Sequence, residues 1–166
     1  MRRLNEESLE ALIVEQMVDG GWAEGAPADY VASHALDLGQ FTEFISATQP
    51  DLVEPLGLAS DTPTRHKFLA RLQGEITRRG VVHMLRNGID HLGLHVDLYY
   101  PAPDAANPKA AALFEANRFV VTRQVHYSVS NTGDAVDLVG FINGLPVFTF
   151  ELKNNFTNQT VEDAVQ

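Results

Sequence analysis

Three residues near the C-terminal end of the chain have the types and spacing of a metal-dependent hydrolase. Asp137 lies in the first of two apolar runs, and Glu151 and Lys153 close the second, which reads L-P-V-F-T-F. Because side chains alternate along a strand, Glu151 and Lys153 point to the same face. Two carboxylates and an amine at one end of an apolar hairpin suit a divalent metal and a water nucleophile.

An Asn143-Gly144 pair between the two runs is the strongest short-range signal for a β-hairpin. A bare two-residue loop there would leave Asp137 and Glu151 on opposite faces, because side chains alternate strictly. We therefore predict an extra residue between positions 142 and 147, as a three-residue loop or a bulge at Leu145-Pro146. Asn143 or Gly144 should then adopt a positive φ.

In that register Asp137 lies beside Glu151, and Lys153 points to the same side, which we expect to open to solvent. The opposite face should be buried against helices through Phe148, Phe150 and Leu152. The two carboxylates would lie about 5 Å apart. They would repel by about 3 kcal/mol at an effective dielectric constant of roughly 20, which calls for a cation. Ligation by oxygen alone favours Mg²⁺ or Mn²⁺ over zinc. Lys153 would hold the attacking water and offset charge in the transition state.

A Glu-x-Lys at a strand end is, by itself, more often a solvated ion pair than a site. Here, however, Asp137-x13-Glu151-x-Lys153 resembles the PD-(D/E)xK nuclease motif. The stretch D-L-V-G-F-I-N-G-L-P-V-F-T-F-E-L-K-N, followed by T-V-E-D-A-V-Q, is similar to the N-terminal nuclease domain of the restriction (R) subunit of type I restriction endonucleases. F-V-V-T-R-Q-V-H-Y-S and the G-W after the first helix also resemble that family, and the similarity is sharp over residues 117–166.

The resemblance implies Mg²⁺-dependent cleavage of double-stranded DNA within a larger complex. It implies an ATP-driven translocase in the same polypeptide, with ATP needed only there, and separate methyltransferase and specificity subunits. The chain itself has no G-x-x-x-x-G-K-[ST] loop. The competing interpretation is a nuclease-like docking module that attaches the R subunit to its partners without cutting. The recognition sequence would be set in another subunit.

The resemblance also implies roles for single residues. Asp137 and Glu151 would be metal ligands, the Leu152 carbonyl a third ligand, and Lys153 the catalytic lysine. Such nucleases often add a glutamate from the first helix, for which Glu10 is the candidate and Glu7, one turn earlier, the alternative; a solvated helix face is the competing interpretation for both. The pattern departs from the family in two places. Val136 stands where the motif has proline, and the glutamine–tyrosine box would begin at or just past position 166.

Basic residues suggest where nucleic acid would bind. Half of the 12 lysines and arginines fall between Arg65 and Arg86, where Glu75 is the only acid. Four arginines are candidates for nucleic-acid contacts: Arg71, Arg78, Arg118 and Arg123. A solvated helix that balances an acidic chain is the alternative for the Arg65–Arg86 cluster. The net charge of −10 argues against non-specific polyanion binding by the whole chain.

The composition of the chain limits its number of domains, its cellular location and its relation to membranes. At 166 residues with 45% apolar content, the chain fits one domain with a real core. The absence of cysteine excludes disulfides and thiolate metal sites and fits a cytoplasmic location. The N-terminus turns acidic before any long apolar run, which excludes a signal peptide there, and no window resembles a membrane span.

Periodicity and capping signals predict the elements that must position the site. Helices are expected over 4–18, 37–48, 62–86 with a bend near Gly80, and 107–117, and strands over 94–100, 119–129 and the hairpin 134–153. The first helix should bury Leu9, Leu12, Ile13 and Met17. Residues 23–29 should form a loop. A last helix should start at Asn158 or Thr160, which suggests a fragment of a longer polypeptide. The fold class is α/β (mixed α+β), with a restriction-endonuclease-like core in which helices flank a mixed sheet.

Overall fold

The structure is a computed structural model that describes residues 6–104, 107–131 and 133–152. Its helices are α1 (Glu6–Asp19), α2 (Leu38–Thr48), α3 (Pro63–Arg79), α4 (Val81–Asn87) and α5 (Pro108–Glu115), with 3-10 turns at Pro27–Asp29 and Pro50–Leu52. Its strands are β1 (Ala23–Glu24), β2 (Tyr30–Val31), β3 (Leu36–Asp37), β4 (Ile89–His91), β5 (Leu94–Val96), β6 (Phe119–His126), β7 (Ala135–Ile142) and β8 (Leu145–Phe150). The predicted mixed α/β class is confirmed, and the arrangement is consistent with a restriction-endonuclease-like core.

A four-stranded mixed sheet carries the predicted hairpin. Its strand order is β1-β6-β7-β8, with β1 parallel to β6 and the other neighbours antiparallel. The prediction of a loop over residues 23–29 was therefore wrong at its start, because Ala23 and Glu24 pair with β6. Two residues are too few to show an alternating pattern, so the sequence offered no sign of this strand.

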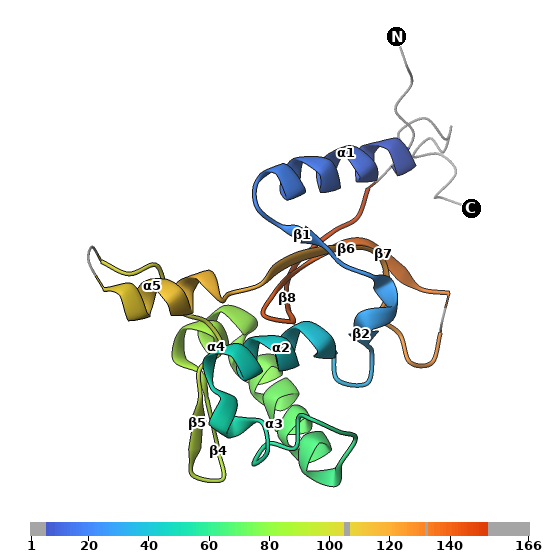
Figure 1. Ribbon diagram of the computed structural model, residues 1–166. Helices are drawn as coiled ribbons and strands as arrows, with labels where there is room; N and C mark the ends of the chain where they lie inside the picture. The colour runs from blue at the N-terminus through green and yellow to red at the C-terminus, as the bar shows by residue number, and fades with distance from the viewer. Residues whose placement is uncertain (1–5, 105–106, 132, 153–166) are drawn as a thin grey trace.

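Helix α1 lies across one side of the sheet (Figure 1). Val14 packs with Val121 of β6 and Leu138 of β7, and Ile13, Met17 and Trp22 border this cluster. Leu12, predicted to point inward, is 40% exposed, whereas Glu10 is only 8% exposed. Positions 10, 14 and 17 share one face of a helix. The inward stripe of α1 therefore includes a carboxylate, which the apolar pattern alone did not reveal.

The main core lies on the other side, among α2, α3 and α4 and the tip of the β7–β8 hairpin (Figure 1). The side chain of Thr62 caps α3 by accepting from the Arg65 N–H at 3.1 Å. Gly80, with φ of 85°, separates α3 from α4, which confirms the predicted bend. The fully buried side chains of this core include Phe41, Phe44, Ile45, Phe68, Leu69, Leu72 and Leu145.

Two predicted strands differ from the observed ones. The strand expected over 94–100 is reduced to β5, which pairs only with β4 in a separate hairpin. The strand expected over 119–129 ends at His126, and Tyr127 and Val129 are 50% and 72% exposed. The apolar alternation in the sequence continues beyond His126. The strand ends there because His126 pairs with Ala135, the first residue of β7. In the part of the chain that the structure describes, no helix has the length and apolar character needed to cross a bilayer.

Candidate active site

The turn of the β7–β8 hairpin is the predicted Asn143-Gly144 pair. Both residues have positive φ, 52° and 81°, and Ile142 pairs directly with Leu145. The connection is thus a two-residue loop, in which asparagine and glycine tolerate the left-handed conformation that most residues avoid. By strict alternation this loop alone would place Asp137 and Glu151 on opposite faces.

A bulge just beyond the turn restores the register. Phe141 pairs with Pro146 and Gly140 with Phe148, so Val147 is the extra residue on β8. The predicted irregularity is confirmed, and it lies one residue after Leu145-Pro146. The last pair is Leu138 with Phe150, one residue short of Asp137 on β7 and of Glu151 after β8, so this register continued by one residue would set Asp137 opposite Glu151. The structure therefore has the strand register that the carboxylate site requires.

The tip of the hairpin is buried rather than exposed. The side chain of Asn143 donates to the Leu98 carbonyl at 2.9 Å and to Asn117 Oδ1 at 3.0 Å, and it accepts from the Arg118 N–H at 2.7 Å. The Gly144 carbonyl accepts from the Asp37 N–H at 2.9 Å. Asn143 has no exposed surface. These bonds anchor the turn in the core and so hold the register of both strands.

The open end of the hairpin, where β7 begins at Ala135 and β8 ends at Phe150, lies next to several polar groups. Asp137 Oδ2 accepts from the backbone N–H of Leu152 at 2.6 Å. Asp137 Oδ1 accepts from Gln124 Nε2 at 3.3 Å, and the same nitrogen donates to Glu10 Oε1 at 2.9 Å. A carboxamide has two N–H hydrogens, which suffice for one bond to each carboxylate. One neutral amide thus links a carboxylate of α1 to a carboxylate of β7.

Gln124 was not among the predicted site residues. It lies inside β6 yet has φ of 51°, a conformation that is uncommon outside glycine and costs of the order of 1–3 kcal/mol. Strain of this kind is found at functional sites when the surrounding contacts hold it in place. The signal in the sequence is the polar pair Arg123-Gln124 between Thr122 and Val125, of which only the arginine was predicted to have a role.

Glu10 and Glu7 were the two candidates on the first helix. Glu7 is exposed, whereas Glu10 is buried and shares Gln124 with Asp137. The structure therefore brings Glu10, and not Glu7, to Asp137. Their carboxylate oxygens are the ligand type that Mg²⁺ and Mn²⁺ prefer, and the Gln124 amide lies between them.

The remaining predicted ligands lie at the edge of what the structure describes. Glu151 is exposed and follows the last residue of β8. Lys153 and the predicted last helix lie outside the described residues. Within residues 6–104, 107–131 and 133–152, no group of three or more histidine, aspartate and glutamate side chains is gathered closely enough to hold a metal. Among these residues, Glu10 and Asp137 therefore form a pair of carboxylates and not part of a larger ligand group.

The prediction of a buried face on β8 was wrong. Phe150 is 43% exposed, and Phe148 and Leu152 are half-buried. β8 is the edge strand of the sheet, and the α1 cluster covers β6 and β7 instead. Phe148 packs against Trp22 and Phe150, with ring centroids 5.5 and 5.2 Å apart, so aromatic contacts replace the expected helix.

The four predicted DNA-contacting arginines fall in two regions. Arg118 bonds Gln40 and pairs with Glu43 at 2.7 Å, and Arg123 pairs with Glu24 at 2.7 Å. Both are near the sheet, and an acidic partner balances each. Arg71 and Arg78 lie on α3, which Figure 1 shows in the helical part of the molecule, on the other side of the sheet from α1.

Comparison with models of protein families gives a match over almost the whole chain. The family model described as type I restriction enzyme R protein N terminus (HSDR_N) matches residues 3–166. No curated protein and no solved structure gives a significant match to the chain.

Proposed function

The chain belongs to the family of type I restriction enzyme R protein N termini, and on that premise we propose that it is a Mg²⁺-dependent endonuclease domain that hydrolyses DNA phosphodiester bonds. The observation that carries the proposal is the carboxylate pair Glu10–Asp137, which the side chain of Gln124 joins. Three different elements, α1, β6 and β7, thus bring two acids and a glutamine with strained backbone together beside the open end of the hairpin.

The residues of the open end have distinct roles in this proposal. Asp137, Glu151, Glu10 and the Leu152 carbonyl would supply oxygen ligands. Bound Mg²⁺ would polarise the phosphodiester and favour deprotonation of water. Lys153 would orient the attacking water and offset negative charge that develops on the phosphate. The Leu152 N–H fixes the orientation of the Asp137 carboxylate at 2.6 Å.

The proposed context is a type I restriction complex in the cytoplasm. The chain would form one nuclease domain, followed in the same polypeptide by an ATP-driven translocase that alone uses ATP. Methyltransferase and specificity subunits would select the site on double-stranded DNA. With a net charge of −10, this chain gains from partners that hold the DNA for it.

A docking module without nuclease activity is the second candidate. The observation that favours it is the pairing of Arg118 and Arg123 with Glu43 and Glu24, which offsets positive charge near the sheet. A surface of this kind attracts DNA weakly but can join a protein partner. In this case the R subunit would use the fold for attachment.

The test is the substitution of Asp137 or Lys153 by alanine in the complete restriction complex. We expect DNA cleavage to fall by at least a thousandfold, because each change removes a group on which the chemistry depends. ATP turnover and translocation should persist, since they belong to another part of the polypeptide. Cleavage is followed on circular DNA with one recognition site, and ATP turnover is measured in the same samples.

Asp134→Ala and Lys109→Ala are the matched controls. Asp134 precedes β7 by one residue, and Lys109 lies exposed on α5. Both controls should cut at the wild-type rate. Normal cutting by Asp137→Ala and Lys153→Ala would refute the nuclease function at these residues. Failure of those variants to co-purify with the other subunits would instead favour the docking module.

A further inference from the structure

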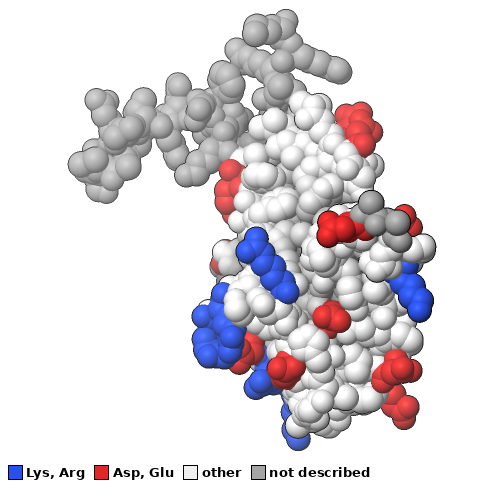
Figure 2. Space-filling view, turned by 90° about the vertical axis from the view of Figure 1, so that its left-hand side faces the viewer, with Lys and Arg blue, Asp and Glu red and all other residues white. Residues whose placement is uncertain are grey.

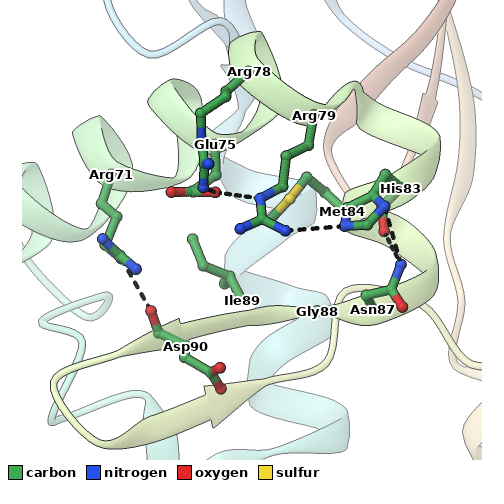
Figure 3. A pocket seen from close by; sticks show the side chains of 10 residues that line it. All are labelled: Arg71, Glu75, Arg78, Arg79, His83, Met84, Asn87, Gly88, Ile89 and Asp90. Carbon is green, nitrogen blue, oxygen red and sulfur yellow. Dashed lines mark hydrogen bonds and ion pairs between the residues drawn. The ribbon is translucent and has the colours of Figure 1, made fainter.

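A pocket of about 360 Å³ lies between α3, α4 and β4 (Figure 3). Figure 3 shows charged side chains of α3, together with His83 and Asn87 of α4, around the space above β4. The charged and histidine residues of its lining are Arg71, Glu75, Arg78, Arg79, His83 and Asp90. The hairpin proposed for catalysis contributes no residue to this lining, so the pocket needs an explanation of its own.

Two of the arginines are held in place by one acid. Glu75 Oε2 accepts from Arg78 Nη2 at 2.6 Å and from Arg79 Nε at 2.8 Å. The hydrogen bond from Arg78 is the main cause that lowers the pKa of the Glu75 carboxyl, and the bond from Arg79 adds to it. Glu75 therefore stays charged. The Arg78 and Arg79 side chains nevertheless remain 61% and 45% exposed. An incoming anion would therefore meet two oriented guanidinium groups that share a single negative charge, at a reduced entropic cost.

The third arginine is not neutralised by an acid. Arg71 Nε donates to the backbone carbonyl of Asp90 at 3.0 Å, which orients the side chain but leaves its charge unbalanced. The Asp90 carboxylate bonds His95 Nδ1 at 2.7 Å. Among the residues that the structure describes, no carboxylate forms an ion pair with Arg71. The pocket therefore carries an excess of positive charge.

This charge stands out against the rest of the molecule. The residues from Arg65 to Arg86 include six of the chain's 12 basic residues and a single acid, although the whole chain has a net charge of −10. In Figure 2 the part of the surface nearest the grey atoms shows acidic and no basic side chains. Basic side chains gather lower down along one edge of that view. A polyanion would therefore be directed to the helical part of the molecule.

The spacing of the arginines indicates what kind of anion fits. Arg71 and Arg78 are seven residues apart on one face of α3, about 10.5 Å along its axis. Consecutive phosphates of one DNA strand advance by about 3.4 Å along the duplex, so several fall within that length. A single phosphate cannot contact both ends. The lining includes no Phe, Tyr or Trp ring on which a base could stack.

We propose that this pocket binds the sugar–phosphate backbone of duplex DNA through at least two phosphate groups. The inference rests on the proposed function, which supplies DNA as the substrate. It adds a second contact in the helical part of the chain, away from Asp137. DNA held at both places would be fixed in its orientation relative to the open end of the hairpin.

The test is the binding of a fluorescently labelled 20-base-pair duplex by the purified chain in EDTA, across a series of salt concentrations. Arg71→Gln and Arg78→Gln should each weaken binding several-fold and lower the slope of log affinity against log salt by about 1. The double variant should bind at least tenfold more weakly and lose about 2 from the slope. Thermal unfolding of each variant verifies that the fold is kept.

Lys109→Gln is the control, because it removes one positive charge from an exposed position on α5 outside the pocket. It should bind within twofold of the wild type. Equal losses in Lys109→Gln and Arg71→Gln would overturn the proposal, as would an unchanged slope in the double variant. If the double variant binds DNA normally but no longer joins its partner subunits, the pocket takes an acidic protein segment and the DNA assignment is wrong.

The absence of Mg²⁺ keeps this test separate from the proposed nuclease activity. Normal DNA binding by the pocket variants, together with loss of cleavage in Asp137→Ala, would refute only the pocket. Weakened binding in the pocket variants, together with normal cleavage by Asp137→Ala, would refute only the catalytic assignment.

Discussion

The two ends of the β7–β8 hairpin contrast sharply. At the tip, Asn143 is fully buried and its side chain makes three hydrogen bonds to groups distant in the sequence. At the open end, Asp137 is half-buried and Glu151 is exposed, and Gln124 holds a strained backbone conformation. The tip is held by buried hydrogen bonds, whereas the open end gathers polar groups. A firmly anchored tip can therefore set the strand register at an end that carries carboxylates.

The bulge connects the two ends. Without Val147, the strands fixed by the tip would separate Asp137 from Glu151. Gly140 lies where the bulge begins, and a Cβ at this position would come within 2.1 Å of the Phe148 ring. Glycine therefore allows Phe148 to lie over β7 and the register to shift. The site depends on the tip through this short irregular segment.

The largest effect on stability is expected from Asn143→Ala at the tip. The change removes three hydrogen bonds of the buried Asn143 side chain, among them the bond to the Leu98 carbonyl, and places alanine at φ of 52°. The free energy of unfolding should fall by about 4 kcal/mol. Denaturant unfolding measures it. Asn131→Ala, at an exposed turn with a 3.4 Å bond to Gly133, should cost less than about 0.5 kcal/mol. Equal losses of unfolding free energy in Asn143→Ala and Asn131→Ala would show that the tip is no more important for stability than an exposed turn.

A smaller effect is expected from Gln124→Glu at the open end. The new carboxylate would face Glu10 and Asp137, so the free energy of unfolding at pH 7 should fall by about 2 kcal/mol. The loss should shrink at pH 4, where carboxylates begin to protonate, and Mg²⁺ should restore part of it by binding the folded state. Thermal unfolding with and without Mg²⁺ measures both effects.

Gln16→Glu makes the same chemical change at an exposed position on α1. This control should stay within about 0.5 kcal/mol of the wild type and should gain nothing from Mg²⁺. If Gln124→Glu were as stable as the wild type at pH 7 and indifferent to Mg²⁺, the two carboxylates would not form a cation site.

The smallest effect concerns Asp37, whose backbone N–H bonds the hairpin tip and whose side chain caps α2. Burial raises the pKa of the Asp37 carboxyl, although the Gln40 N–H opposes the shift. The folded state therefore keeps this proton to a higher pH than the unfolded chain. The wild type should lose stability as the pH rises from about 3.9, the ordinary aspartate pKa, through the raised one.

Asp37→Asn removes this titration and keeps a good N-cap. Its stability relative to the wild type should therefore increase as the pH rises through that range, as measured by urea unfolding at a series of pH values. Asp51→Asn is the same change at an exposed position. A stability difference between Asp37→Asn and the wild type that does not vary with pH would show that burial of Asp37 carries no electrostatic cost.

Local patterns in the sequence determined much of the architecture. Thr62-Pro63 predicted the start of α3, Gly80 the bend that separates α3 from α4, and Asn143-Gly144 the turn. The need for one extra residue near the turn also followed from the sequence, because side chains alternate strictly and the positions can be counted. These signals act between residues close in the chain, so no knowledge of the tertiary structure was required.

Only the tertiary structure decided how the two ends of the hairpin are held. Gln124 reaches Glu10 across 114 positions of sequence, and Asn143 reaches Leu98 across 45. Neither contact leaves a periodic signal in the sequence, because a polar residue that bonds a distant group resembles one that faces water. The exposure of Phe150 was missed for a related reason: alternation assigns a residue to a face, but only the packed fold decides whether a helix covers that face.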